Sequence, residues 1–268
     1  MELRDSVAVI TGGASGIGRE TARQLAAKGC RLVLADVEEM ALRQAVEELS
    51  ATVSTVGFVV DVSDRLQVEN LADETYSAFG RADIVFNNAG VAVSGPIVEM
   101  THSDWRWQID VNLWGPIHGT ESFVPRMVEA GNGGHVLYTA SFAGLAPNVG
   151  LGPYCVTKYG VVALAEVLHR EMRAHGIGVS VLCPMRVATN IGASARNRPE
   201  ELGGPSDEPL VADQSEDNPD LAGRVLAVED VAAQVVAAIG TDRLYIVPHE
   251  ESRGMVRRRF ERIDRAYS

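Results

Sequence analysis

Cysteine is scarce in this sequence, and its cysteines stand far apart. There are three of them, which are Cys30, Cys155 and Cys183. An odd number at wide spacing argues against a disulfide framework or a zinc site and is typical of reduced thiols in the cytoplasm. His102, His135 and His175 also lack the spacing of metal ligands, so we expect no metal site.

Positive charge and long apolar runs are lacking as well. The chain has 24 Lys and Arg residues against 36 Asp and Glu residues, which gives a formal net charge of −12. A negative surface repels a phosphate backbone, so we expect no nucleic-acid partner. No apolar run is long enough to span a bilayer, and the chain runs from Met1 directly into a strand pattern. We therefore predict neither a membrane segment nor a signal peptide, and we expect a cytoplasmic protein.

Apolar residues are abundant instead, and they form two alternating kinds of segment. The chain has 268 residues and is 46% hydrophobic, which is enough for a packed core. Apolar runs typical of buried strands occur at 7–10, 31–35, 56–60, 82–86, 135–139, 179–183 and 244–247. Helical spacing occurs between them, for example at 19–28, 38–49, 66–79 and 232–239. We therefore predict an α/β protein with a Rossmann-type, doubly wound, mostly parallel sheet of about seven strands and helices on both faces.

One segment departs from this alternation. Residues 199–220 are rich in Pro, Gly, Asp and Glu and show little periodicity, which predicts a loop. The loop is either a solvated surface excursion or a lid over a binding site. Because no linker divides the chain, we predict one dinucleotide-binding and catalytic domain over 1–268, with a substrate loop or lid at about 191–226.

A glycine-rich turn follows the first predicted strand and precedes a helix, which is the context of a dinucleotide-binding turn. The residues that we expect to contact a dinucleotide there are Gly12, Ser15, Gly16, Ile17 and Gly18. Gly12 permits a tight turn, Gly16 lets the backbone approach a pyrophosphate, and Gly18 lets the helix pack close to the sheet. The helix N-terminus then presents free N–H groups to the phosphates.

Asp36 is the residue that follows the second predicted strand, and it indicates whether the cofactor is NAD or NADP. An acidic side chain about 20 residues after the turn can accept hydrogen bonds from both hydroxyls of the adenosine ribose. Repulsion of roughly 1–4 kcal/mol between its carboxylate and a 2′-phosphate favours NAD over NADP. Arg19 is the counter-indication, because an arginine near this turn can grip a 2′-phosphate. We give Asp36 more weight, since its place at the strand end is better specified.

Tyr154 and Lys158 stand four residues apart and share one face if their segment is helical. A tyrosine near its free pKa of ~10 is a poor base at neutral pH, but a nearby ammonium stabilises the phenolate. Tyr154 can then accept a proton from an alcohol or donate one to a carbonyl. Ser141 follows the strand predicted at 135–139, at the edge where open α/β sheets bind ligands, so its hydroxyl can hold a substrate oxygen.

Most of the sequence, from about Val7 to Thr189, resembles the short-chain dehydrogenase/reductase family. The glycine-rich turn matches the family's cofactor turn. The family's catalytic tetrad is matched, in order and spacing, by Asn112, Ser141, Tyr154 and Lys158. The resemblance implies that Asn112 holds a water that links Lys158 to solvent and that Ser141 orients the substrate oxygen. It also implies that Lys158 binds the nicotinamide ribose.

The resemblance implies further cofactor contacts. They are Asp61 and Val62 at the adenine, Asn88, Ala89 and Gly90 beside the central sheet, and Pro184, Val187 and Thr189 at the nicotinamide. Thr189 corresponds to the threonine that holds the carboxamide. The family usually has glycine after Pro184, where this sequence has Met185, and glycine lets the backbone approach the nicotinamide. Met185 can instead direct an adaptable apolar side chain into the substrate pocket.

The combined pattern predicts an NAD-dependent oxidoreductase that interconverts a secondary alcohol and its ketone, with Tyr154 as the acid/base. The residues expected around the substrate are Val93, Ser141, Phe142, Leu145 and Met185. Most of them are apolar, so we expect a largely apolar alcohol or ketone.

Two other functions remain open. One is a non-catalytic NAD-binding sensor or scaffold, against which the complete tetrad argues. The other is an epimerase or dehydratase with tightly held NAD, which the short chain after Thr189 disfavours. We also predict a homo-oligomer, with a tetramer favoured by the resemblance and by the apolar helix that includes Val161 to Leu168.

Overall fold

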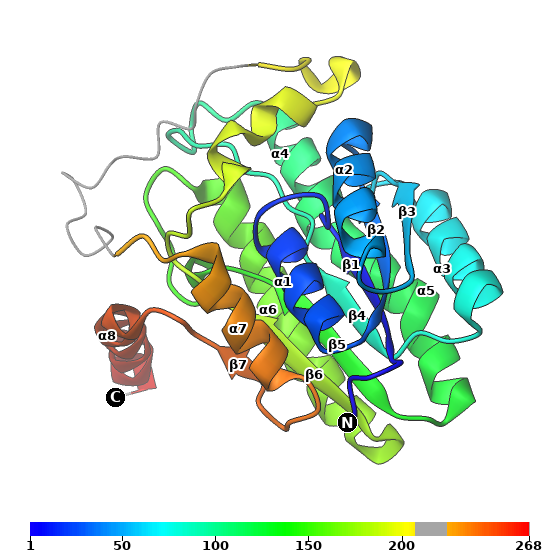
Figure 1. Ribbon diagram of the computed structural model, residues 1–268. Helices are drawn as coiled ribbons and strands as arrows, with labels where there is room; N and C mark the ends of the chain where they lie inside the picture. Colours follow the sequence, from blue (N-terminus) through cyan, green and yellow to red (C-terminus); the bar gives the residue numbers. More distant parts are fainter. Residues whose placement is uncertain (207–223, 268) are drawn as a thin grey trace.

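A parallel sheet forms the centre of the computed structural model, which describes residues 1–206 and 224–267 (Figure 1). Within these residues the strand order is β3-β2-β1-β4-β5-β6-β7, and all pairings are parallel. The strands are β1 (Val7–Thr11), β2 (Arg31–Asp36), β3 (Thr55–Val59), β4 (Ile84–Asn87), β5 (Gly134–Thr139), β6 (Ile177–Leu182) and β7 (Tyr245–Ile246). This order confirms the predicted Rossmann-type fold.

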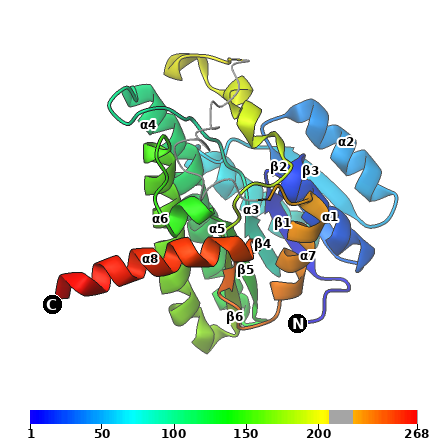
Figure 2. The same cartoon turned by 90° about the vertical axis from the view of Figure 1, so that its left-hand side faces the viewer.

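Helices cover both faces of the sheet (Figures 1 and 2). The first face carries α1 (Gly16–Ala27), α2 (Glu39–Ser50) and α7 (Val228–Ala238), and the second carries α3 (Arg65–Phe79), α5 (Gly115–Ala130) and α6 (Gly152–Met172). Two further α-helices within the described residues are α4 (His102–Ile109) and α8 (Arg253–Asp264). Helix α8 reaches away from the body, and none of its residues is buried (Figure 2).

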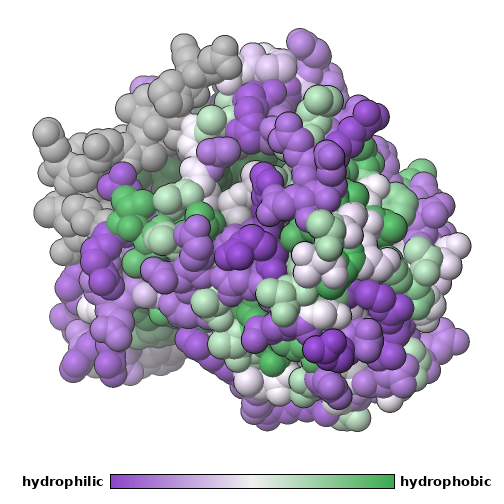
Figure 3. Space-filling model, in the orientation of Figure 1, coloured by the Kyte–Doolittle hydropathy of each residue, from purple (hydrophilic) through white to green (hydrophobic). Residues whose placement is uncertain are grey.

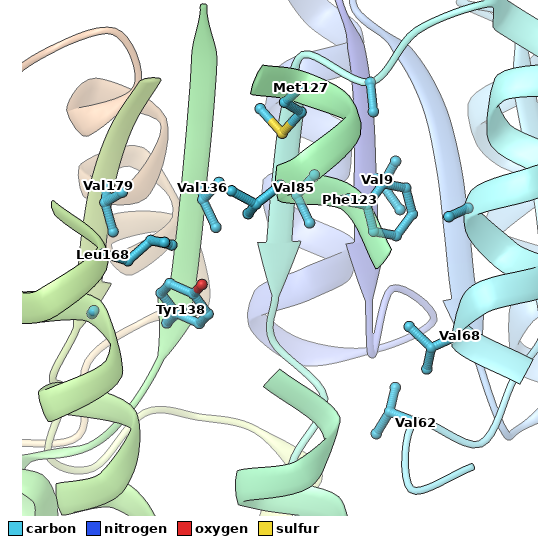
Figure 4. Close-up of a cluster of buried hydrophobic side chains, with 14 of the residues drawn as sticks. Val9, Val62, Val68, Val85, Phe123, Met127, Val136, Tyr138, Leu168 and Val179 are labelled. Carbon is cyan, nitrogen blue, oxygen red and sulfur yellow. The ribbon is translucent and has the colours of Figure 1, made fainter. Parts of the chain in front are cut away.

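The strands are apolar on both sides because each side packs against helices. In β1, Val7 and Val9 belong to the core under α3, α5 and α6, whereas Ala8 and Ile10 belong to the core under α1, α2 and α7. Figure 4 shows the first core, in which Val9 lies near Phe123 of α5. Burying one such side chain contributes about 1.5–3 kcal/mol, so neighbouring positions in one strand stabilise opposite layers.

One long helix carries a local change of pitch. Helix α4 begins at a capping box, in which Thr101 and Asp104 each bond the backbone N–H of the other. The helix continues through a π-helical turn, Asp110–Trp114, directly into α5. Such turns are frequent at functional sites, and this one contains Asn112.

The structure differs from the predicted loop after Thr189. Two short 3₁₀ segments, Asn190–Asn197 and Glu200–Leu202, form there. Leu202 is buried and packs against Val91 and Trp107, so apolar contact orders a stretch that lacks periodicity. Residues 207–223 of the predicted lid lie outside the described residues.

The outer surface over α1 and α7 is mainly hydrophilic, with apolar residues scattered among polar ones (Figure 3). Among the helices of 1–206 and 224–267, we find none with the length and hydropathy needed to cross a bilayer.

Candidate active site

A cavity of about 480 Å³ opens at the carboxyl ends of the strands. It lies where the strand order reverses between β1 and β4, which is the usual ligand site of an open α/β sheet. Its walls are the glycine-rich turn, the chain after β2, β3 and β4, parts of α4 and α6, and residues 189–202. The predicted residues that line it are Gly12, Ser15, Gly16, Ile17, Asp36, Asp61, Val62, Asn88, Ala89, Gly90, Tyr154, Lys158 and Thr189.

The glycine-rich turn has no room for side chains at two positions. Gly12 has a φ of +62°, and a Cβ there would lie 2.9 Å from the Cα of Ala89. A Cβ on Gly18 would lie 2.1 Å from the carbonyl oxygen of Gly12, so Gly18 brings α1 close to the turn without itself lining the cavity. Ser15 makes no side-chain cap within the described chain, which leaves the first N–H groups of α1 for a phosphate.

Asn88 ties three strands together beside this turn. Its Nδ2 donates to the carbonyl oxygens of Thr11 and Gly12 at 3.1 and 3.2 Å, and its Oδ1 accepts from the Thr139 hydroxyl at 2.9 Å. The Thr11 hydroxyl oxygen accepts in return from the backbone N–H of Asn88 at 3.0 Å. These contacts fix the ends of β1, β4 and β5 at the floor of the cavity.

Asp36 ends β2 with its carboxylate toward the cavity. Its oxygens accept from the backbone N–H of Ala14 at 3.0 Å and of Glu38 at 3.1 Å. Burial raises the pKa of the carboxyl, and these backbone hydrogen bonds oppose that shift. Arg19, the residue that could favour NADP, forms an ion pair with Glu48 and is absent from the cavity lining among the described residues.

Tyr154 and Lys158 lie together on α6, as their spacing predicts. They are 8% and 2% exposed, and the Lys158 Nζ lies 5.4 Å from the centre of the Tyr154 ring. The ammonium donates to the carbonyl oxygen of Thr139 at 2.9 Å. Burial lowers the pKa of Lys158 to about 8 and raises that of Tyr154 to about 12, and a hydrogen bond with Ser141 opposes the second shift.

Asn112 and Ser141 lie just behind the cavity wall. The Asn112 side chain pairs with the backbone of Val91, whose N–H and carbonyl each lie 2.8 Å from it. A Cβ on Gly90 would lie 3.2 Å from the Asn112 Oδ1 and 3.4 Å from the Lys158 Nζ, so both polar groups converge on Gly90. The Ser141 Oγ accepts from the backbone N–H of Ala143 at 3.1 Å.

The five residues predicted around the substrate do not line this cavity as described. They are Val93, Ser141, Phe142, Leu145 and Met185. Phe142 is 2% exposed, and Leu145 packs against the main core. The predicted nicotinamide contacts Pro184 and Val187 are also outside the lining, although they flank Met185 in the turn that leads to Thr189.

The apolar side chains that do line the cavity are different ones. Besides polar groups, the lining contains Val91, Trp107, Val111 and Leu202. Leu202 lies at the end of residues 190–202, which we name the covering segment. Leu202 lies within the lid predicted at about 191–226. The sequence did not indicate Val91, Trp107 or Val111 as site residues, because the contacts that place them join positions far apart in the chain.

The covering segment is fixed to both sides of the cleft. On one side Arg196 forms an ion pair with Glu38, and the Asn197 amide donates to the same carboxylate at 3.0 Å. On the other side Arg198 forms an ion pair with Asp104 at 2.7 Å. The Arg198 guanidinium also lies 5.6 Å from the centre of the Trp107 ring. Two residues before Arg196, the Ser194 Oγ accepts from the N–H of Ala92 at 3.0 Å.

Comparison with known proteins identifies the class. The family model described as short chain dehydrogenase matches residues 6–200, and the chain belongs to this family. It is similar to a C alpha-dehydrogenase of Sphingobium sp. strain NBRC 103272 / SYK-6, with 34% identity over 98% of this chain and 86% of that protein. A 1-deoxy-11-beta-hydroxypentalenate dehydrogenase of Streptomyces exfoliatus is also 34% identical, over 100% of this chain and 92% of that protein.

A solved structure supports the same class. The short chain dehydrogenase/reductase from Burkholderia phymatum, determined in complex with NAD, superposes with a TM-score of 0.90. The two chains are 38% identical, and the match covers 98% of this chain and 96% of the other. The protein is thus an oxidoreductase of the short-chain dehydrogenase/reductase family.

Proposed function

We propose that the protein is an NAD-dependent oxidoreductase that interconverts a secondary alcohol and its ketone. The observation that carries this proposal is the buried pair of Tyr154 and Lys158, which lines the same cavity as the glycine-rich turn. The turn fits a dinucleotide because Gly12 leaves no room for a Cβ and the first turn of α1 is free for phosphate. When bound, the nicotinamide accepts or supplies the hydride.

Tyr154 moves the proton in this scheme. In oxidation its phenolate oxygen accepts the proton of the substrate hydroxyl, and in reduction its phenol donates a proton to the ketone oxygen. Burial raises the pKa of Tyr154, so Lys158 has to supply the positive charge that stabilises the phenolate. Ser141 holds the substrate oxygen, and Asn112 carries the proton path from Lys158 through a water.

The cofactor preference follows from Asp36. Its carboxylate is held in place by two backbone N–H groups, and it faces the cavity beside Val37 and Glu38. A 2′-phosphate would meet this carboxylate, whereas ribose hydroxyls would donate to it. Arg19 is engaged by Glu48 and does not offset the repulsion. The relative solved with NAD is consistent with this preference.

The substrate proposed is a small, largely apolar alcohol or ketone. The apolar side chains of Val91, Trp107, Val111 and Leu202 line the same cavity as Tyr154 and offer an apolar contact surface. Residues 191–226 act as the lid, and the anchors of the covering segment at Glu38 and Asp104 support this role. Excluding water there favours hydride transfer.

A turnover assay separates this function from a non-catalytic sensor. We expect the protein to reduce NAD with members of a panel of apolar secondary alcohols. Tyr154→Phe should lose about 10²–10⁴-fold in kcat while retaining NADH binding, because only the proton transfer is removed. A Tyr154→Phe variant that works at the wild-type rate would exclude the assignment, and NADH binding without turnover by the wild type would favour the sensor.

The proposed assembly is a cytoplasmic homotetramer. The apolar positions Val161 and Leu168, which suggested an interface, are buried in the chain's own core. The opposite side of α6 is the better candidate, since Val156 and Val167 are 51% and 55% exposed. Apolar residues exposed on one helix face are typical of contact with a symmetry mate.

A further inference from the structure

His249 lies just after β7, outside the cavity lining, and it is completely buried. Both of its ring nitrogens contact backbone. Nδ1 accepts from the N–H of Met185 at 3.2 Å, and Nε2 lies 3.1 Å from the carbonyl oxygens of Arg186 and Arg224. Because an amide N–H can only donate, Nδ1 carries no proton, and the ring is the neutral tautomer with its proton on Nε2.

The turn that this ring holds borders two predicted functional groups. Before Met185, the carbonyl oxygen of Pro184 accepts from the N–H of Phe142 at 2.8 Å and from the Ser141 hydroxyl at 3.4 Å. Four residues after Met185 comes Thr189, which lines the cavity. The turn therefore links the serine proposed to hold the substrate oxygen with the threonine proposed to hold the carboxamide.

The same ring also contacts the chain near Arg224, where the chain returns to this turn. Arg224 precedes Leu226, whose N–H donates to the Arg186 carbonyl at 3.0 Å and whose carbonyl accepts from Ala188 at 3.0 Å. Chain leaving the turn and chain returning to it thus meet at one buried imidazole. The ring gives the N–H of Met185 a buried acceptor, at the position where the family usually has glycine. The Arg186 carbonyl accepts from the ring in addition to the N–H of Leu226.

We propose that His249 is a positioning residue for hydride transfer. It holds the turn from Pro184 to Thr189 in the place that aligns Ser141 and Thr189 at the nicotinamide end of the site. The role rests on the proposed function, and it is exerted through the backbone, since the ring lies outside the cavity. A displacement of about 1 Å in such a turn is enough to cost about 100-fold in rate.

The test compares His249→Leu, His249→Gln and His249→Asn. Leucine fills similar space but makes none of the ring's hydrogen bonds. Glutamine offers an acceptor and a donor on one long side chain, whereas asparagine offers both on a side chain too short to span the two backbone segments. The hydrogen bonds that Ser252 makes go to the carbonyl of His249 and are retained in every variant.

His135 provides the matched control. It too is completely buried, with Nδ1 accepting from the N–H of Gly240 at 3.2 Å and Nε2 at 2.9 Å from the Ser180 hydroxyl. It lies at the amino-terminal edge of β5, on the opposite edge of the sheet from the cavity. His135→Leu therefore has a comparable effect on folding without touching the turn.

Two measurements separate positioning from folding. The first is the affinity for NADH relative to ADP-ribose, which lacks the nicotinamide, and the second is kcat per folded molecule. For His249→Leu we expect NADH affinity to fall about 10-fold with ADP-ribose affinity unchanged, and kcat to fall at least about 10-fold. His249→Gln should recover most of both losses and His249→Asn little, whereas His135→Leu should change neither quantity.

The possible outcomes distinguish the two proposals. If His249→Leu lowers thermal stability but leaves the NADH to ADP-ribose ratio and kcat unchanged, the positioning role is overturned. If His249→Leu does not fold, the comparison of His249→Gln with His249→Asn decides by the same ratio. If the wild type binds NADH but turns over no alcohol, the proposed function fails, while the binding ratio still tests His249.

Discussion

Removing the charge of Lys158 should shift the pH dependence of alcohol oxidation. In the proposed mechanism oxidation needs the phenolate of Tyr154, and the Lys158 ammonium lies 5.4 Å from the centre of its ring with both residues buried. At an effective dielectric constant of about 20, two unit charges at that separation interact by about 3 kcal/mol. This energy corresponds to about two pKa units, so Lys158→Met should raise the apparent pKa of the rate by that amount.

The assay is the pH profile of kcat for oxidation, with NAD saturating. Below the apparent pKa the rate of Lys158→Met should be about 100-fold lower than that of the wild type, and it should approach the wild-type rate as pH rises. Lys158→Arg keeps the charge and should move the profile much less. Because Lys158 is also expected to bind the nicotinamide ribose, the affinity for NAD is measured separately. If the acid side of the Lys158→Met pH profile coincides with that of the wild type, the electrostatic role of Lys158 is refuted.

Three further predictions concern the cofactor, stability and assembly. The wild type should prefer NAD by at least about tenfold in kcat/KM, and Asp36→Ala should narrow that gap; an unchanged ratio would show that Asp36 does not face the ribose. Burial lowers the pKa of His135 from 6.5 to about 4, so the native state binds its proton more weakly than the unfolded chain. Stability should therefore fall as pH drops below about 6.5, by up to about 3 kcal/mol at pH 4, and urea unfolding should show a shallower loss for His135→Gln. Light scattering should show a tetramer, and Val167→Asp should give a smaller species; a monomeric wild type would contradict the assembly.

Local patterns predicted several residues that the structure brings to one cavity, where we propose the cofactor binds. The glycine-rich turn, Asp36 and the pair of Tyr154 and Lys158 each depend on residues close together in sequence or at a strand end. Strand periodicity then brings them to one edge, because parallel strands end at the same side of the sheet. The structure places all of these groups except Gly18 on one cavity, and Gly18 acts behind it by admitting α1.

Apolar character alone did not predict whether a side chain points into the core or toward a site or interface. Val161 and Leu168 belong to the face of α6 that packs on the sheet, whereas Val167, next to Leu168, is exposed. Phe142 and Leu145 likewise follow β5 at the correct edge but turn into the core. Position in the chain predicts that such a residue is near the site, while its direction depends on the tertiary packing.

The substrate half of the site depends on contacts that no short motif contains. Leu202 reaches Trp107 because Arg198 pairs with Asp104, a residue 94 positions earlier in the chain. Arg196 reaches Glu38 across 158 positions, and both side chains line the same cavity as Asp36. Changes in the covering segment can therefore alter which substrate fits without altering the turn that is proposed to bind phosphate. Short motifs can therefore indicate the proposed cofactor chemistry, whereas the substrate depends on contacts that form only in the assembled fold.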